Sequence, residues 1–391
     1  TGPYMLKKET MQKGKSLTMV RRLDWWGYEN PNNKHSFNFD EIKVVIVQDD
    51  RLTLEKFKKG ELDLYFVNRA QWWIEEFDLD KKEFDYLHRG LIQKKKIYNY
   101  RWKGISGLAF NMRREPFNDI RMRKVFAKMW NIELLKDKLF FNEYGQLKSY
   151  FPGGVYENQE NPLVSYAPNE AVQLLKEAGW STRDNAGWLV KNGKRFELNM
   201  AIDQSLERIF TPYQEDLKKV GIKLNLNYQT GQTTFKNVMN DRNYDLHYQG
   251  WTSLMIPNPE SAWHSSMADV AGTVNITGVK NKKIDALIQQ YNKSLDAQER
   301  VQLIQQIDAL LVAMQPYALG WGAPYTVRVC YWNKFGMPAS VVGYSGDWKS
   351  VISMWWMDTQ KAIAVEQAKK DQSMVFQHDK TDFYYADQKQ P

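Results

Sequence analysis

Residues 196–202 (FELNMAI) and 222–226 (IKLNL) flank a helix-forming segment, and this succession determines the class of fold. Apolar and polar residues alternate in both runs, as they do in half-buried strands. The segment between them predicts a helix over 206–220 that ends at Gly221. A strand, a helix and a second strand in this order form a βαβ unit with parallel strands, so the sequence predicts an α/β fold.

Strand and helix patterns continue on both sides of this unit. On the N-terminal side we expect strands at 42–48, 62–67 and 108–111, and helices at 52–59 and around 122–129. On the C-terminal side we expect strands at 244–250, 317–321 and 325–331, helices at 284–291 and 296–314, and a polar, extended or frayed tail from about 367.

The composition excludes several classes of protein. Of the 391 residues, 43% are hydrophobic and 26% are charged, which is ordinary for a globular chain. No apolar run approaches the ~18 residues of a transmembrane helix. The one cysteine, Cys330, excludes an internal disulfide framework, and its apolar surroundings predict a buried, inert thiol. Aromatic residues make up 14% of the chain and include 15 Trp, which favours a protein with ligand-binding surfaces.

Charge and motifs favour a binding protein. The formal net charge is +8, but acidic and basic residues are interspersed, so we expect a solvated mixed surface and no nucleic-acid partner. The five histidines show no metal-ligand spacing. We find no phosphate-binding or dinucleotide-binding glycine motif and no nucleophile elbow. We therefore expect a protein without catalytic residues, cofactor or bound metal.

Several short motifs follow one another in a recognisable order. They are TGPY at 1–4, DWWG at 24–27, FKKGELD at 57–63, LAFN at 108–111 with PFNDIRMR at 116–123, AVQLLKEAG at 171–179 and DLHYQGW at 245–251. In this order they resemble the family 5 extracellular solute-binding proteins, the dipeptide and oligopeptide receptors of ABC importers. Three further segments are most similar to the Yej-type subgroup, which binds oligopeptides and the peptide-nucleotide antibiotic microcin C: 263–275 (WHSSMADVAGTVN), 331–338 (YWNKFGMP) and 355–358 (WWMD).

The resemblance covers about residues 1–362 and implies an architecture of periplasmic binding protein type II-like lobes. It implies that 1–98 and 327–391 form an incomplete lobe I, that 107–325 form a complete lobe III, and that lobe II is missing. Crossings near 100–107 and 323–328 would be the hinge. Because TGPY follows lobe II in the family and no Met or signal peptide opens the chain, we expect a C-terminal fragment, with weak or absent peptide binding or with a dimer that covers the gap.

The resemblance also implies a function. We expect the substrate-binding subunit of an ABC importer, working in the periplasm. Its ligand would be an oligopeptide or peptide-like compound, bound in an interlobe cleft without catalysis, and its partners would be the importer's permease and ATPase. Two alternatives remain open. One is a receptor for a non-peptide solute, such as a nickel complex or an oligosaccharide, and the other is an enzyme of an unrecognised type.

Trp251 is the first candidate ligand-binding residue, because it matches the family's cleft tryptophan. Asn111, at the end of the predicted hinge strand, is the second candidate. Four weaker candidates are Tyr248, Trp263, Trp321 and Tyr344. For each of these residues the competing interpretation is packing in the core of a lobe. Five other tryptophans fall in family motifs expected to pack lobe I: Trp25, Trp26, Trp332, Trp355 and Trp356.

One position departs from the family pattern. Many oligopeptide receptors carry, shortly after the cleft tryptophan, an Asp that pairs with the α-ammonium group of the peptide. Leu254 occupies that position here. A buried ammonium group without an anion is costly, so capture of the peptide N-terminus by that mechanism is in doubt. Glu260 or Asp269 could take over this role.

Overall fold

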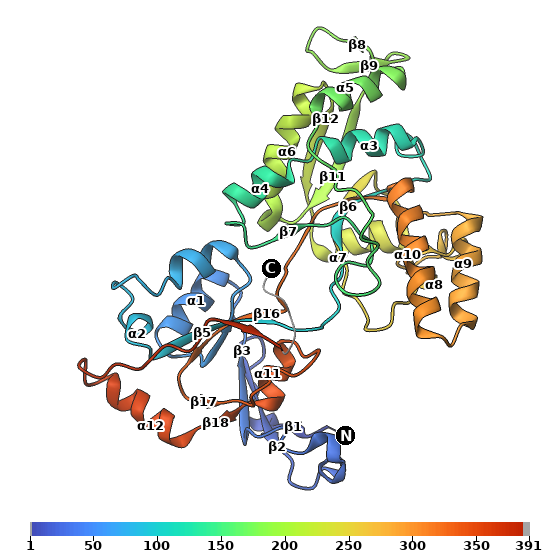
Figure 1. Cartoon of the computed structure of the whole chain (residues 1–391). Helices are drawn as coiled ribbons and strands as arrows, with labels where there is room; N and C mark the ends of the chain where they lie inside the picture. Colours follow the sequence, from blue (N-terminus) through green and yellow to red (C-terminus); the bar gives the residue numbers. More distant parts are fainter. Residues whose placement is uncertain (1, 386–391) are drawn as a thin grey trace. The chain divides into compact units, whose positions relative to one another are not determined.

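The computed structural model describes residues 2–385 and divides into two units (Figure 1). The first unit combines Thr1–Arg101 with Pro324–Pro391, and the second is Trp102–Ala323. Thr1, which opens the TGPY motif, and residues 386–391 of the expected lobe I segment lie outside the described residues. Within the described part, no helix is long and apolar enough to cross a membrane. The assignment of the units to lobes stays a prediction.

The predicted βαβ unit forms part of the second unit. β11 (Glu197–Ile202) and β12 (Lys223–Tyr228) pair in parallel, and α6 (Glu207–Lys219) connects them. Gly221 ends the turn after α6 with φ +87, a left-handed conformation that glycine adopts without strain. The α/β prediction and its parallel strand pair are therefore confirmed.

A second sheet of this unit has the strand order β13-β6-β14. β13 (Leu246–Gly250) and β14 (Tyr317–Leu319) both pair antiparallel with β6 (Ser106–Phe110). Because side chains alternate between the two faces of a strand, the two faces of β6 enter different cores. Leu108 and Phe110 join the core that also contains β11 and β12, and Ala109 joins a second core.

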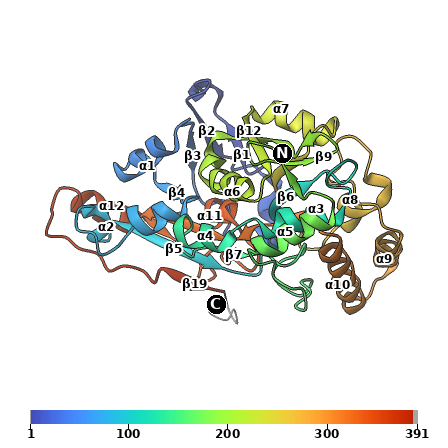
Figure 2. The same ribbon diagram turned by 90° about the horizontal axis from the view of Figure 1, so that it is seen from above.

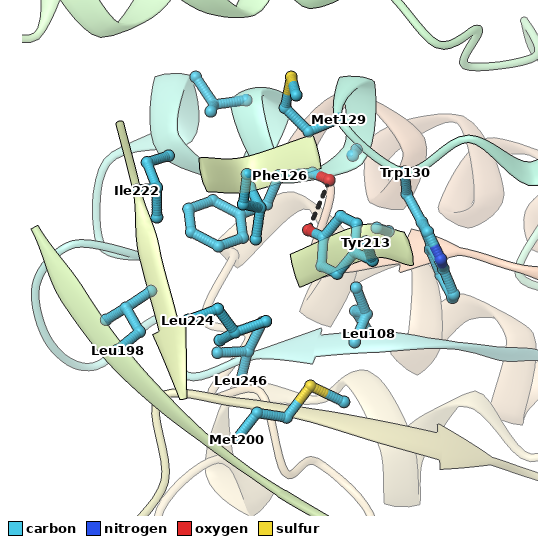
Figure 3. Packing of buried hydrophobic residues seen from close by; sticks show 14 of the residues in the cluster. Leu108, Phe126, Met129, Trp130, Leu198, Met200, Tyr213, Ile222, Leu224 and Leu246 are labelled. Carbon is cyan, nitrogen blue, oxygen red and sulfur yellow. Dashed lines mark hydrogen bonds between the residues drawn. The ribbon is translucent and has the colours of Figure 1, made fainter. Parts of the chain in front are cut away.

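Helices cover both faces of the β13-β6-β14 sheet, while one face of the β11-β12 pair stays largely exposed. The first core packs against α3 (Ile120–Lys128), α4 (Ile132–Lys138), α5 (Pro168–Glu177) and α6. Figure 3 shows this packing, with the hydroxyl of Tyr213 in α6 donating to the carbonyl oxygen of Phe126 in α3 at 2.9 Å. The second core packs against α9 (Lys282–Lys293) and α10 (Ala297–Met314), which lie side by side in Figures 1 and 2.

A buried carboxylate joins α10 to the loop at 149–161. Asp308 is fully buried and accepts hydrogen bonds from the Ser149 hydroxyl, the Asn161 amide group, and the backbone N–H groups of Tyr150 and Asn158. Burial raises the pKa of this carboxyl group, while the four donors lower it. The donors stand in for the water that Asp308 loses on folding.

The shorter elements complete the second unit. Their bounds are β7 (Gly145–Gln146), β8 (Thr182–Arg183), β9 (Leu189–Lys191), β10 (Lys194–Arg195), η5 (Gln204–Leu206), α7 (Gly231–Phe235), η6 (Lys236–Asn240), α8 (Pro259–Trp263), η7 (Ser265–Met267) and β15 (Trp321–Gly322).

The first unit contains a four-stranded sheet of order β19-β5-β16-β4. All six residues of β16 (Val327–Trp332) are buried, because both faces of this inner strand are covered. Cys330 faces the core that includes α1 (Asp50–Lys58) and α12 (Thr359–Ala368). Val329 faces the core that includes α11 (Trp348–Met354). The prediction of a buried Cys330 is confirmed.

The neighbouring strands of this sheet are β5 (Ile92–Tyr98), β4 (Leu64–Phe66) and β19 (Asp382–Tyr384). The remaining elements of the first unit are η1 (Lys8–Thr10), η2 (Trp26–Glu29), η3 (Pro31–Asn33), η4 (Trp72–Glu76), α2 (Asp85–His88), β17 (Phe335–Gly336) and β18 (Trp356–Met357).

The C-terminal tail is more ordered than its composition predicts. β19 pairs in parallel with β5 and so extends the sheet. The guanidinium group of buried Arg89 donates from Nη1 to the carbonyl oxygens of Ala368, Asp371 and Met374. The prediction of an extended or frayed tail from about 367 is therefore confirmed as extended for the described residues after α12, and the frayed alternative is wrong for them. The polar sequence of the tail does not reveal that its backbone pairs with β5 and contacts Arg89, which is distant in the sequence.

A small sheet at the start of the chain stays largely uncovered. β1 (Tyr4–Leu6), β2 (Ser16–Arg21) and β3 (Glu41–Val45) form it in this order, and none of their residues is buried. The strands predicted at 42–48 and 62–67 consequently belong to different sheets, β3 to this one and β4 to the larger one.

Three of the five motif tryptophans pack as predicted. Trp25, Trp332 and Trp355 are buried. Trp26 is 71% exposed and Trp356 is 40% exposed, so the packing prediction is wrong for these two side chains. Adjacent positions in a motif point in different directions, and the pattern of letters does not reveal which of the two faces the core.

Candidate functional site

A pocket with a volume of about 290 Å³ lies within the second unit. Ile202, the last residue of β11, and Gln229, which follows β12, both line it. The pocket thus lies at the carboxyl ends of the parallel strands, where α/β proteins commonly bind ligands. α7 contributes Phe235 and η6 contributes Met239. Further wall residues are Asp203 and Leu206 around η5, residues 247–249 of β13, and Trp251.

Trp251 lines the pocket and is held at both its backbone and its side chain. Its backbone N–H donates to the carbonyl oxygen of Ile105 at 2.8 Å. Its indole Nε1 donates to the hydroxyl oxygen of Tyr317 at 3.0 Å. Tyr317 is itself buried, so this hydrogen bond links a pocket residue to the second core. The first candidate from the sequence therefore lies where a ligand can reach it.

The backbone behind Trp251 requires a glycine at 104. An added Cβ on Gly104 would lie 1.6 Å from the carbonyl oxygen of Trp251, far inside van der Waals contact. Trp263 supports the same arrangement from inside the core, because its ring packs edge-on against Tyr317 with centroids 6.1 Å apart. Trp263 is buried and does not line the pocket, so in this structure it acts by packing against Tyr317.

Tyr248 also lines the pocket, and it joins the pocket to the first core. Its ring stacks on Trp321 with centroids 5.4 Å apart and an interplanar angle of 18°. Trp321 packs further against Phe140 and Trp130. Burial raises the pKa of the Tyr248 hydroxyl. Trp321 is thus a packing partner of a pocket residue and does not belong to the pocket wall itself.

His247 is the ionisable group most closely surrounded by the pocket wall. Burial lowers the pKa of its imidazole to about 4, although the side chain of Gln249 and the backbone of Ala201 partly oppose this shift. The ring is therefore neutral at physiological pH. Its Nδ1 is buried and has no hydrogen-bond partner among the residues that the structure describes. The pocket wall thus contains a neutral polar group within largely apolar surroundings.

The two other candidates are not among the described residues that line this pocket. Asn111 is buried and donates from Nδ2 to the carbonyl oxygens of Arg242 and Tyr244, so it holds the turn before β13. Tyr344 belongs to the first unit, is 54% exposed, and stacks on Tyr100 with centroids 4.7 Å apart. A ligand-binding role for either residue stays a prediction.

The segment after Trp251 is exposed and apolar. Leu254, at the position of the family's aspartate, is 63% exposed. Glu260 accepts a hydrogen bond from the side chain of Asn292. Asp269 forms ion pairs with Arg113 and Lys280, which lower the pKa of its carboxyl group. Both carboxylates that could replace the missing aspartate are thus engaged within the chain, and neither lines the pocket.

Sequence patterns alone do not identify three important residues. Gly104 gave no signal, because its function depends on the approach of a backbone segment distant in sequence. His247 follows the expected alternation of a strand, yet only the fold places it beside a pocket. Phe235 lies in a polar stretch with no periodic pattern. Within residues 2–385, no group of three or more His, Cys, Asp or Glu side chains is placed to hold a metal ion.

Comparison with known proteins establishes the family. The model of the bacterial extracellular solute-binding proteins, family 5 Middle, matches residues 1–271, and the chain therefore belongs to this family. The chain is 26% identical over 394 residues to the probable peptide-binding protein YejA of Agrobacterium fabrum, covering 91% of this chain and 62% of the relative. It is 26% identical over 408 residues to the uncharacterized protein YejA of Escherichia coli, covering 95% and 65%. The chain thus spans less than two thirds of the length of these relatives.

Solved structures share the α/β fold. The oligopeptide-binding protein AppA of Bacillus subtilis, in complex with a nonapeptide, has a TM-score of 0.73 at 18% identity, covering 91% of this chain and 66% of AppA. DppA of Helicobacter pylori, in complex with the peptide STSA, has a TM-score of 0.72 at 17% identity, covering 92% and 63%. NikZ of Campylobacter jejuni, in complex with Ni(L-His), has a TM-score of 0.70 at 17% identity, covering 91% and 68%. The family and the fold are those of binding proteins.

Proposed function

We propose that this chain is the ligand-binding part of a peptide receptor that serves an ABC importer in the periplasm. Its partners would be an oligopeptide or peptide-like ligand and the importer's permease with its ATPase. Membership of the family supports this proposal, as do relatives whose names or complexes refer to peptides. The lobe assignment of the sequence, including a second lobe outside this chain, belongs to the same proposal.

The observation that carries the proposal is a pocket beside an open strand end. β13 is an edge strand, hydrogen-bonded to β6. Its last residue, Gly250, is exposed, and a Cβ there would meet nothing within 4 Å. A peptide that lies along this end can use its backbone groups, while one side chain enters the pocket next to Trp251. This arrangement suits ligands of varied sequence, because the backbone is common to all peptides.

A titration of the 391-residue chain tests the proposal. We expect heat of binding from mixed tri- to pentapeptides at concentrations up to the millimolar range, and no cleavage of the peptides by mass spectrometry. A nickel–histidine complex and an oligosaccharide serve as comparison ligands, since one protein of this fold was solved with Ni(L-His). Binding of either comparison ligand without binding of any peptide would refute the peptide assignment. Cleavage would refute a function limited to binding.

We also propose that copies of the chain associate through the uncovered sheet. β1 and β3 are its edge strands, and Met5 and Val44 on them are exposed. Exposed strand edges with apolar residues pair readily with other chains. Sedimentation velocity should show association that increases with concentration and that Val44→Lys weakens. A strictly monomeric chain across the whole concentration range would contradict this part of the proposal.

A further inference from the structure

The pocket beside Trp251 is small for a complete ligand. Its volume of about 290 Å³ lies at the lower end of the range of about 300–1,000 Å³ that small-molecule sites occupy. A peptide of several residues does not fit into this space, whereas one bulky side chain does. If the proposed peptide function holds, the pocket therefore selects one residue of the ligand.

The wall of the pocket is mostly apolar. Its apolar and aromatic members come from every element around it, and they include Ile202, Leu206, Phe235, Met239, Tyr248 and Trp251. An apolar side chain that enters this space loses contact with water and gains contact with these groups, which favours binding. A charged side chain would lose its hydration without gaining an equally strong partner.

Asp203 is the one carboxylate in the pocket wall, and it is poorly placed to hold a cation. It is exposed, and its carboxylate already accepts a hydrogen bond from the backbone N–H of Ser205 as the N-cap of η5. Ion pairs at exposed sites are weak, because water and salt screen them. Asp203 therefore does not offset the cost of burying a lysine or arginine side chain.

His247 adds one polar contact to this apolar wall. It lines the pocket on β13, and its ring has an unused hydrogen-bonding capacity, since Nδ1 is buried without a partner in the described residues. A neutral imidazole offers one N–H donor and one acceptor nitrogen. Nδ1 is shielded from the pocket in this structure, so the ring must turn before a ligand reaches it. A side chain with a polar tip, such as the phenol of tyrosine, then gains a hydrogen bond that phenylalanine cannot make.

We propose that this pocket takes one bulky, uncharged side chain of the ligand, and that His247 gives preference to an aromatic side chain with a polar tip. The inference rests on the proposed peptide function and specifies its selectivity. Tyrosine at the selected position should bind better than phenylalanine, and both should bind better than glutamate, lysine or glycine.

A matched peptide series tests this selectivity. In peptides of one length, Gly, Phe, Tyr, Glu or Lys is placed at each position in turn, and affinity for the 391-residue chain is measured by calorimetry. At one position, we expect Phe to bind about tenfold tighter than Glu, Lys or Gly. At that position the Tyr peptide should bind about two- to tenfold tighter than the Phe peptide, because a neutral hydrogen bond contributes this much to affinity.

Two variants separate the parts of the proposal. His247→Leu should remove the advantage of Tyr over Phe and keep the advantage of Phe over Glu. Leu206→Glu, which brings charge into the wall, should lower the affinity for Phe and Tyr peptides more than the affinity for Gly peptides. His88→Leu changes an exposed histidine of the first unit and serves as the matched control. It should leave the ratios between the peptide affinities unchanged. Thermal melts confirm that each variant is folded.

The outcomes distinguish this inference from the proposed function. Equal affinity for Phe, Glu and Lys at every position would overturn the inference and leave peptide binding intact. A preference for Glu or Lys would overturn it as well. An advantage of Tyr over Phe that persists in His247→Leu would remove His247 from the proposal. Failure of all peptides to bind would refute the proposed function itself, and the inference with it.

Discussion

The contact between Gly104 and Trp251 shows how one atom can decide the position of a site residue. The backbone of Gly104 approaches the carbonyl oxygen of Trp251 at a distance that leaves no room for a Cβ. The indole of Trp251 in turn donates to the buried hydroxyl of Tyr317. The position of the pocket wall therefore depends on a residue that does not touch the pocket.

Gly104→Ala should destabilise the protein and move Trp251. The new methyl group forces the two backbone segments apart, and overpacking of this kind costs about 1–3 kcal/mol. Gly145→Ala is the matched control, because a Cβ at Gly145 meets nothing within 4 Å. We expect a lower free energy of unfolding in urea for Gly104→Ala alone, with reduced affinity for peptides. Equal unfolding curves for both variants would contradict the structure at this point.

His247 predicts a dependence of stability on pH. Its pKa falls from the ordinary value of 6.5 to about 4 on folding, because burial disfavours the charged ring. Between these two values the unfolded chain binds a proton that the folded chain does not, so stability falls as the pH falls from 6.5 to 4. The loss amounts to about 3 kcal/mol, since each pKa unit corresponds to about 1.4 kcal/mol.

Urea unfolding at several pH values between 7 and 4 measures this effect. As the pH falls from 6.5 to 4, the wild type should lose about 3 kcal/mol of unfolding free energy relative to His247→Leu, because the variant lacks the group that gains the proton only on unfolding. A constant difference between the two proteins over this range would show that His247 is protonated as easily in the folded state as in the unfolded one.

At the scale of residues, the sequence identifies part of the candidate site. Trp251 and Tyr248 are predicted and line the pocket. Trp263 and Trp321 are also predicted, yet they pack behind these two residues. Aromatic residues serve both purposes with the same side chain, and alternation along a strand cannot tell a pocket from a core. His247 and Gly104 acquire their roles only through contacts between distant segments.

Among the elements, the segment before β19 is held by several side chains, and the buried Arg89 reaches more of its carbonyl oxygens than the others do. Arg89 is 6% exposed and donates to three carbonyl oxygens of the segment between α12 and β19. Buried carbonyl groups that lose their donor cost free energy, because no water replaces it. The C-terminal segment is thus attached by Arg89, by contacts of Gln93, Tyr331 and Lys95 with Gln377 and Asp379, and by the pairing of β19 with β5.

Arg89→Ala should release this segment. We expect a loss of about 3 kcal/mol in the free energy of unfolding, as several buried groups lose their partner. Amide hydrogens of residues 382–384 should exchange faster, which mass spectrometry detects in the C-terminal peptide. Arg51→Ala removes an exposed arginine and is the control, expected to change stability by well under 1 kcal/mol. Unchanged exchange in Arg89→Ala would show that the strand pairing and the contacts of Asp379 hold β19 without this arginine.

The sequence predicts those elements best whose pattern is local. α6 and α10 lie within one or two residues of their predicted bounds, because amphipathic periodicity agrees with a terminating glycine or proline, and because Asp296 caps α10. β19 was not predicted, because its pairing with β5 joins segments that are far apart in the sequence. Likewise, the pattern of β3 and β4 does not reveal that they enter different sheets.

On the scale of the whole molecule, the two units differ in how the chain builds them. The second unit is one continuous segment, Trp102–Ala323, with two cores of its own. The first unit needs two segments, because β16 from the C-terminal part lies between β5 and β4 from the N-terminal part. The sequence predicts this order of segments only through the family resemblance, since periodicity carries no information on which strands return to which sheet.

Residues 102–323 should fold when produced alone, whereas residues 2–101 should not. The first polypeptide keeps its complete cores, while the second lacks the central strand of its sheet. Circular dichroism and thermal unfolding would show a cooperative transition for 102–323 and none for 2–101. A cooperative transition of 2–101 would contradict the central role of β16, and an unfolded 102–323 would contradict the independence of the second unit.

The burial of Cys330 has a practical consequence for spectroscopy. It is the one cysteine of the chain, it is fully buried in β16, and burial raises the pKa of its thiol. The thiolate that reacts with maleimide dyes is therefore scarce and shielded in the folded protein. Cysteines introduced at exposed positions, one in each unit, can be labelled while Cys330 stays in place. Energy transfer between two such dyes would report changes in the distance between the units when a peptide is added.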